Sequence, residues 1–159
     1  LFKAMKDIFK LWNRYLKEDT LSDYEQGDRL TLYHYSRADS DRLILDPEHF
    51  LSGRNSFSKR EYEKSQVPRT FFYLDPAQAE PIVKSGRNLY TVSVNPSDIY
   101  DLKSDPEGII TSSRQPGAFF VDYNKVFNTI KREYKGAYYG TPSFDVVAWF
   151  ESIQSTKEI

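Results

Sequence analysis

The chain has 159 residues, of which 39% are hydrophobic, and its 22 basic and 23 acidic side chains leave a formal net charge of −1. This length suits one domain with its own core, and the balanced charge excludes a general attraction to nucleic acid or membrane surfaces. The absence of cysteine excludes disulfides, thiolate metal sites and cysteine nucleophiles. No apolar run approaches the roughly 20 residues that span a bilayer, so we expect no membrane span.

Two differently patterned stretches open the chain. Residues 1–17 carry apolar side chains at helical spacing between basic ones, which predicts an amphipathic helix. We expect this helix to pack on the domain's own sheet, although a basic amphipathic helix can also bind a membrane or the groove of a partner. Residues 18–29 are mostly polar and predict a connector.

The stretch over residues 30–36 alternates apolar and polar side chains, which predicts a half-buried strand. It ends in His34, Tyr35 and Ser36, just before a polar loop over residues 37–42. Side chains at the end of a strand are held by a rigid sheet and face a loop, where they are well placed to bind a ligand. The alternative for His34 is a core histidine that has one nitrogen in a hydrogen bond.

The rest of the chain predicts further strands and helices in alternation. We expect a strand over 67–74, a helix from Asp75-Pro76 to 84, a strand over 89–94 followed by 99–102, a helix from the cap Asp122 to 133, and strands over 135–140 and 144–150. A short apolar segment over 43–47 ends in a turn, and polar loops are expected over 52–66 and 103–117. This order, without an internal repeat, predicts one mixed α+β domain.

The motif Leu-Tyr-His-Tyr-Ser at residues 32–36 resembles the first motif of the ADP-ribosyltransferase-like fold of the His-Tyr-Glu type. In that family a histidine on a strand binds NAD. The segments that look like the versions in phage-associated polyvalent proteins are 45–47, 69–73, 89–94 with 99–102, and 135–140 before 146–148. The resemblance covers residues 30–153. It implies a mostly antiparallel split sheet, with residues 1–29 as a helix and connector packed on an ADP-ribosyltransferase-like domain over 30–159.

The resemblance also implies a function: binding of NAD as a substrate, and transfer of ADP-ribose to a macromolecular acceptor, as in toxins or effectors of a bacterial or phage-infected cytoplasm. Within it, His34 would bond the ribose, Ser36 would bond the nicotinamide amide, and Tyr73 or Tyr90 would supply a stacking face. The residues that it assigns to NAD binding are His34, Tyr35, Ser36, Arg69, Tyr73 and Tyr90.

Transfer of ADP-ribose passes through an oxocarbenium-like state, which a carboxylate beside the developing positive charge stabilises. The family's catalytic glutamate lies at the start of the last strand. The nearest match here is Asp145, which is one methylene shorter, while Glu151 follows at the far end of the same strand. These two carboxylates are the catalytic candidates, and the departure from glutamate puts transferase activity in more doubt than nucleotide binding.

Two other classes of function remain open. The domain can be a catalytically inactive structural or partner-binding module of a larger phage or bacterial protein. It can also be a ribonuclease that uses His34 and His49 as acid and base, since imidazoles titrate near neutral pH. Neither histidine lies in a cluster with the spacing of metal ligands, so we expect no metal site.

Overall fold

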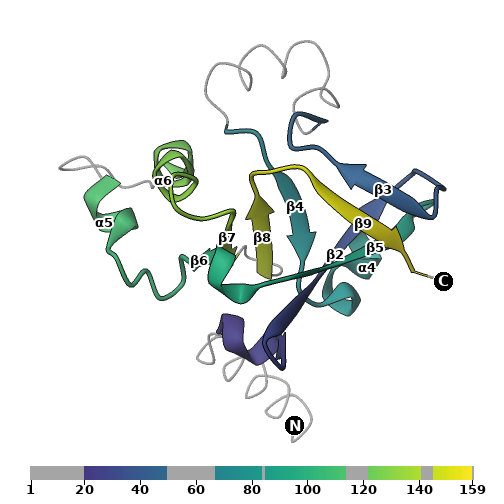
Figure 1. The fold of residues 1–159 in the computed structure, drawn as a ribbon, viewed down its shortest axis with the longest axis horizontal. Helices are drawn as coiled ribbons and strands as arrows, with labels where there is room; N and C mark the ends of the chain where they lie inside the picture. The colour runs from purple at the N-terminus through teal and green to yellow at the C-terminus, as the bar shows by residue number, and fades with distance from the viewer. Residues whose placement is uncertain (1–19, 50–66, 84, 114–121, 141–144, 159) are drawn as a thin grey trace, which may run out of the picture.

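The computed structural model describes residues 20–49, 67–83, 85–113, 122–140 and 145–158 (Figure 1). The helix predicted over 1–17 and the loop predicted over 52–66 lie outside these ranges. Across the described ranges, no helix is both long and apolar enough to cross a membrane.

Nine strands of the described residues form one sheet. They are β1 (Glu25–Gln26), β2 (Arg29–Ser36), β3 (Arg42–Leu45), β4 (Thr70–Tyr73), β5 (Asn88–Val94), β6 (Ile99–Asp101), β7 (Gly136–Gly140), β8 (Asp145–Trp149) and β9 (Ile153–Lys157). Their order is β3-β9-β5-β2-β4-β8-β7-β6, with β1 paired to β2, and every pair is antiparallel except β6 with β7. The predicted α+β class with a mostly antiparallel sheet is therefore confirmed.

Few helices accompany the sheet. The described α-helices are α4 (Pro76–Val83), α5 (Ile109–Ser113) and α6 (Tyr123–Ile130), and two short 3₁₀ helices are η1 (Leu21–Tyr24) and η2 (Pro96–Asp98). As predicted, Asp122 caps α6, because its side chain accepts hydrogen bonds from the backbone of Asn124 and Lys125. The connector predicted over 18–29 contains η1 and β1, and the loop predicted over 103–117 contains α5.

The strand predicted over 144–150 is not the last one, because β9 follows it. β9 lies between β3 and β5, and its buried position is Ser155, which is 1% exposed and donates a hydrogen bond from Oγ to the carbonyl of Leu43 at 2.8 Å. A polar side chain at the buried position hides the apolar alternation that identifies a strand.

The sheet has two halves, one with β3, β9, β5 and β2 and the other with β4, β8, β7 and β6. A single residue pair, between β2 and β4, joins them. β2 pairs with β5 through seven consecutive residue pairs, whereas it pairs with β4 only at Tyr33 and Tyr73. β4 then pairs with β8 along its whole length. Figure 1 shows the result, in which β2 crosses β4 obliquely while β4 and β8 run side by side. Beyond the pair of Tyr33 and Tyr73, on the side where His34 lies, β2 and β4 diverge. We call this divergence the split.

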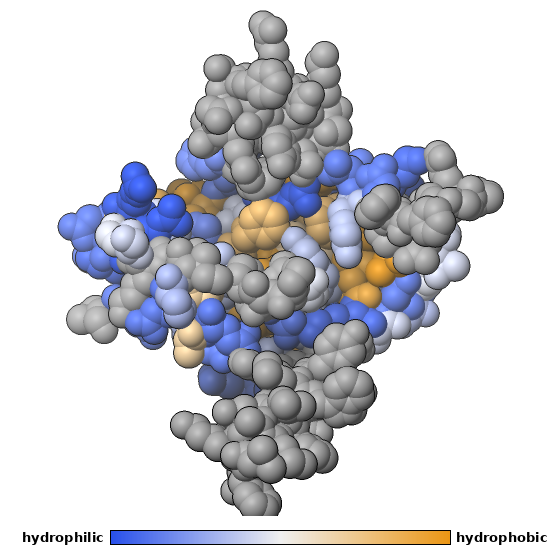
Figure 2. Space-filling view, turned by 180° about the vertical axis from the view of Figure 1, so that it is seen from behind, coloured by the Kyte–Doolittle hydropathy of each residue, from blue (hydrophilic) through white to orange (hydrophobic). Residues whose placement is uncertain are grey.

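Apolar side chains form two clusters, one on each face of the sheet. The first contains Leu30 and Leu32 of β2 together with Val147 of β8, so it spans both halves. The second packs Val126 and its neighbours in α6 onto the half that contains β7 and β8. Figure 2 shows hydrophobic residues at the centre of one side of the molecule with hydrophilic residues around them. The two clusters hold the halves in place, and so they fix the geometry of the split.

Candidate functional site

His34 lies near the end of β2, as the pattern of residues 30–36 predicted, on the side of the Tyr33–Tyr73 pair where β2 and β4 diverge. Its Nδ1 atom lies 2.7 Å from the carbonyl oxygen of Phe71 in β4. A carbonyl only accepts hydrogen bonds, so Nδ1 carries the proton and Nε2 carries a lone pair. Past Tyr33 and Tyr73 the two strands no longer pair, and the imidazole takes the place of a backbone partner for this carbonyl. The tautomer of His34 therefore follows from the divergence of two strands.

The imidazole is uncharged at neutral pH. Burial lowers the pKa of His34 below its usual value, the hydrogen bond to Phe71 raises it in part, and the positive charge of Arg87 lowers it further. Within the part of the chain that the structure describes, no group forms a hydrogen bond with Nε2. His34 thus presents a hydrogen-bond acceptor at the split.

Aromatic and hydroxyl groups of the same strands border the split. The ring of Tyr35 lies 6.4 Å from the ring of Tyr73, and its hydroxyl donates to the carbonyl of Pro76 at 3.4 Å. Ser36 Oγ accepts a hydrogen bond from the backbone of Ala38 at 3.2 Å, which leaves its own hydrogen available for donation. Tyr73 is partly exposed. Strand alternation places both tyrosines on the face of the sheet opposite to His34 and Ser36.

Arg87 is a further residue of this region that the sequence analysis did not single out. Burial raises the pKa of Tyr73 above its usual value, and the positive charge of Arg87 acts against this rise. The same charge also lowers the pKa of His34, so Arg87 acts electrostatically on both side chains. Only its place directly before β5 could have pointed to it.

Arg69, assigned to NAD by the resemblance, has a structural position instead. It is 5% exposed, and its guanidinium lies 4.7 Å from the centre of the Phe127 ring in α6. It also donates to the carbonyl of Val67 at 3.0 Å and to Asn124 Oδ1 at 3.2 Å. These contacts fasten α6 to the segment before β4 and disfavour Arg69 as a ligand of NAD, a role that stays a prediction.

The position of Tyr90 also disfavours the stacking role predicted for it. It pairs with His34 across β2 and β5, but its side chain has no exposed surface. Its hydroxyl lies 3.0 Å from the carbonyl oxygen of Ala38 and 2.8 Å from that of Ser40. The ring is covered and its hydroxyl holds the loop after β2, which leaves Tyr73 as the aromatic candidate.

Asp145 begins β8, as predicted, but its carboxylate is already engaged. Oδ1 lies 2.7 Å from Lys103 Nζ, and Oδ2 accepts hydrogen bonds from the hydroxyls of Tyr24 at 3.0 Å and Tyr138 at 3.1 Å. Burial, together with the charge of Asp145, raises the pKa of Tyr138 well above its usual value, so this hydroxyl stays protonated and donates. The arrangement ties η1 and the segment after β6 to the sheet, and the catalytic role expected for Asp145 stays a prediction.

The register also separates Asp145 from His34. Tyr33, Tyr73 and Val146 form one row across β2, β4 and β8. Both β2 and β8 are antiparallel to β4, so they run in the same direction. Asp145 precedes this row and His34 follows it, so they lie on opposite sides of it. The chain leaves β8 toward Glu151 on the side where His34 lies.

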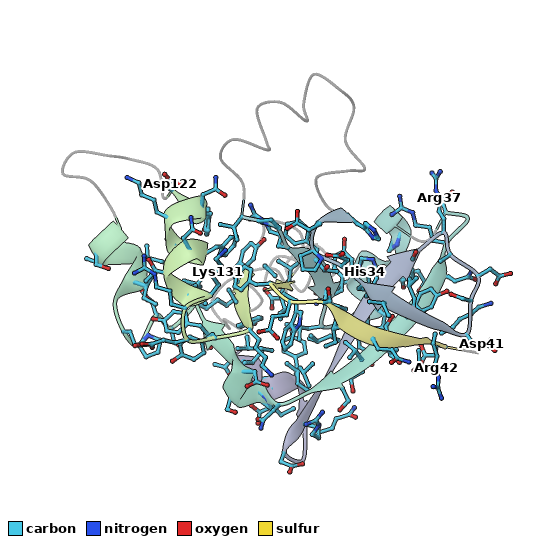
Figure 3. The ribbon with its side chains drawn as sticks, turned by 45° about the horizontal axis from the view of Figure 1, so that its top comes forward. His34, Arg37, Asp41, Arg42, Asp122 and Lys131 are labelled. Atoms are coloured by element: carbon cyan, nitrogen blue, oxygen red, sulfur yellow. The ribbon has the colours of Figure 1, made fainter. Side chains whose placement is uncertain are left out.

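Glu151 is an exposed carboxylate in the bend between β8 and β9. It forms no hydrogen bond or ion pair with any described residue. Its neighbours Phe150 and Ser152 line a cavity of about 170 Å³. The other residues that line this cavity are Asp46, Pro47, Glu48, Pro68 and Lys131. Figure 3 shows Lys131 at the end of α6, apart from His34 beside β4.

His49 does not join His34. It lies in the exposed turn after β3, where its backbone N–H donates to the carbonyl of Asp46 at 3.0 Å. β3 is three strands away from β2 in the sheet, and no described contact links the two imidazoles. In the described ranges, no group of three or more acidic, histidine or cysteine side chains is arranged to hold a metal ion.

No family model, curated protein or solved structure matches the chain.

Proposed function

We propose that the split binds NAD through its nicotinamide and ribose, as the resemblance to ADP-ribosyltransferase-like proteins implies. The observation that carries this proposal is His34: a neutral imidazole, held at Nδ1 by the Phe71 carbonyl, whose acceptor Nε2 has no hydrogen-bond partner among the described residues. Ribose hydroxyls are hydrogen-bond donors of matching chemistry. Because the tautomer is fixed before the ligand arrives, binding needs no rearrangement of the imidazole.

Two further side chains support a flat amide ligand beside the ribose. The Tyr73 ring borders the split and is partly exposed, so it offers an apolar face for the nicotinamide ring. Ser36 Oγ accepts from Ala38 and can still donate, which suits the carbonyl oxygen of the nicotinamide amide. In this arrangement His34 and Ser36 contact the ligand from one face of the sheet, and Tyr73 contacts it from the other.

We assign binding, and not transfer, as the primary activity, because Asp145 is neutralised by Lys103 and lies on the far side of the row from His34. Transfer of ADP-ribose to a macromolecular acceptor is the second candidate. It is favoured by Glu151, whose exposed carboxylate has no partner among the described residues and follows β8 on the His34 side. Separation of the two imidazoles disfavours a ribonuclease that uses His34 with His49.

Calorimetric titration of the purified chain with NAD tests the proposal. We expect binding, and we expect His34→Ala to weaken it by about three- to tenfold, the value of one hydrogen bond to a neutral group. His34→Gln serves as the variant that can still donate to Phe71, so a fold effect is separated from a ligand effect. His49→Ala is the matched control and should leave NAD affinity unchanged.

No heat and no thermal shift at millimolar NAD would contradict the proposal, as would equal affinities of folded His34→Ala and the wild type. The transferase candidate has its own test in NAD hydrolysis. If Glu151 is catalytic, Glu151→Gln should reduce turnover by roughly a hundredfold or more while NAD affinity stays nearly constant. A wild type that binds NAD without turnover leaves binding as the activity.

A further inference from the structure

Two arginines come together at the end of the β2 and β5 pair. Ser36 and Asn88 form the last residue pair of this ladder. Arg37 follows Ser36 and Arg87 precedes Asn88, so antiparallel register brings both arginines to the same end of the sheet. Directly opposite residues within such a ladder lie about 5 Å apart, and the two arginines come one position beyond its last pair. Figure 3 shows Arg37 at this end, pointing outward from the body of the protein.

Both arginine side chains are exposed. Neither Arg37 nor Arg87 forms a side-chain hydrogen bond or ion pair with the described residues. The carboxylate of Asp39, which lies at the same end of the sheet, is in an ion pair with Lys157. The hydrogen bond from Lys157 holds the pKa of Asp39 below its usual range.

Exposed arginines are common, and their position relative to His34 distinguishes these two. Ser36 lies two residues beyond His34, which is about 7 Å along a strand. Arg87 is near enough to act electrostatically on both His34 and Tyr73, which border the split. A positively charged end therefore adjoins the place proposed for the ribose. In a dinucleotide, the group that follows the ribose along the molecule is a phosphate.

We propose that Arg87, together with Arg37, binds the diphosphate of the dinucleotide whose ribose lies at His34. This inference rests on the proposed function. It adds that the site recognises the diphosphate of its ligand, so that the ligand is a diphosphate ester and not a free nucleoside. Guanidinium groups bind phosphate oxygens through paired N–H donors, which a lysine at the same position does not reproduce. Arg87, whose charge acts on both His34 and Tyr73, makes the larger contribution.

Titrations with four probes test this assignment: NAD, nicotinamide riboside, ADP-ribose and inorganic pyrophosphate. Arg87→Gln should weaken NAD and ADP-ribose by about ten- to hundredfold, the effect of losing a hydrogen bond to a charged group. It should leave nicotinamide riboside, which has no phosphate, unchanged. Arg37→Gln should have the same pattern with a smaller loss. Added salt should weaken NAD more than nicotinamide riboside.

Arg42→Gln is the matched control. Arg42 is an exposed arginine at the start of β3, and Figure 3 shows it apart from Arg37. Its substitution should change the affinity of none of the four probes. Unfolding temperatures of all three variants should equal that of the wild type, because each side chain is exposed and its loss removes no packing.

The outcomes separate this inference from the proposed function. If nicotinamide riboside binds in a His34-dependent way but Arg87→Gln leaves NAD affinity unchanged, the assignment of Arg87 and Arg37 is wrong and the ribose site stands. An equal loss of NAD and nicotinamide riboside in Arg87→Gln would also overturn it, since Arg87 would then act through His34. If neither NAD nor nicotinamide riboside binds the wild type, both proposals fail. If a single-stranded oligonucleotide binds in an Arg87-dependent way and NAD does not bind, the two arginines form a nucleic-acid site and the diphosphate assignment is wrong.

Discussion

Replacing Asp145 with asparagine distinguishes a carboxylate that holds the fold together from one that serves a reaction. The Asp145 side chain is 14% exposed and its ion-pair partner Lys103 is 19% exposed. Asparagine keeps the shape but removes the charge, and its amide N–H₂ faces groups that donate hydrogen bonds. The hydroxyls of Tyr24 and Tyr138, which now donate to Oδ2, would lose a charged acceptor.

The expected loss of stability follows from these contacts. Hydrogen bonds to a charged group contribute about 1.5–3 kcal/mol each, and removal of one member of a fully buried ion pair costs about 3–5 kcal/mol. Partial exposure of Asp145 and Lys103 screens the pair, so we expect Asp145→Asn to lower the free energy of unfolding by about 2–4 kcal/mol. For a chain of this size, that loss lowers the melting temperature by roughly 5–15 °C.

Urea and thermal unfolding measure this effect, with Glu151→Gln as the control. Glu151 is exposed in a bend, so its substitution should change the free energy of unfolding by less than about 0.5 kcal/mol. NAD affinity of folded Asp145→Asn should match that of the wild type. The reasoning is refuted if Asp145→Asn keeps its full stability and loses NAD turnover, because the carboxylate would then serve the reaction and not the fold.

Two further predictions concern stability. Because the pKa of His34 is lowered from 6.5, mainly by burial, the unfolded chain binds more protons than the folded one below that pH. The free energy of unfolding should therefore fall as pH drops from 6.5 through the lowered pKa, and urea midpoints should show a smaller fall in His34→Gln; parallel curves would contradict this. A Cβ atom at Gly136 would lie 2.9 Å from Trp149 Cε3, so Gly136→Ala should cost about 1–3 kcal/mol in urea unfolding. Gly140→Ala should cost less, because the nearest atom, at 3.1 Å, is the Cε of the flexible Lys103 chain, and equal costs would show that packing at Trp149 is not the cause.

The sequence predicts best the strands and helices whose apolar residues recur at regular spacing. Alternation over 30–36 predicts β2, and spacing of three and four behind the cap Asp122 predicts α6. It does not predict β9, because the buried position there is a serine that bonds a neighbouring backbone. A strand such as β9, whose own residues do not alternate, can be identified only once its pairing with neighbouring strands is known.

The same distinction applies to the candidate site. The sequence identifies His34 as the end of a strand, but the group that fixes its tautomer is the backbone carbonyl of Phe71, which has no side-chain signature. It also places Asp145 at a strand start, whereas the ion pair that occupies this carboxylate comes from Lys103 in another part of the chain. Burial of Tyr90 depends on the loop that folds back over it. In each case the deciding contact is long-range.

The lowered pKa of His34 also bears on what the imidazole can do once a ligand is bound. A general acid must carry a proton at neutral pH, and burial beside Arg87 disfavours the protonated form of His34. The Nδ1 proton is already donated to Phe71, so proton transfer would have to occur at Nε2. His34 could therefore act only as a base, and the acid of a nuclease pair would have to be His49, which lies in the turn after β3. The imidazole of His34 is neutral, is oriented by Phe71, and has no described partner at Nε2. Such a group is better suited to accept a hydrogen bond from a bound hydroxyl than to exchange a proton with it. This favours ribose binding at the split.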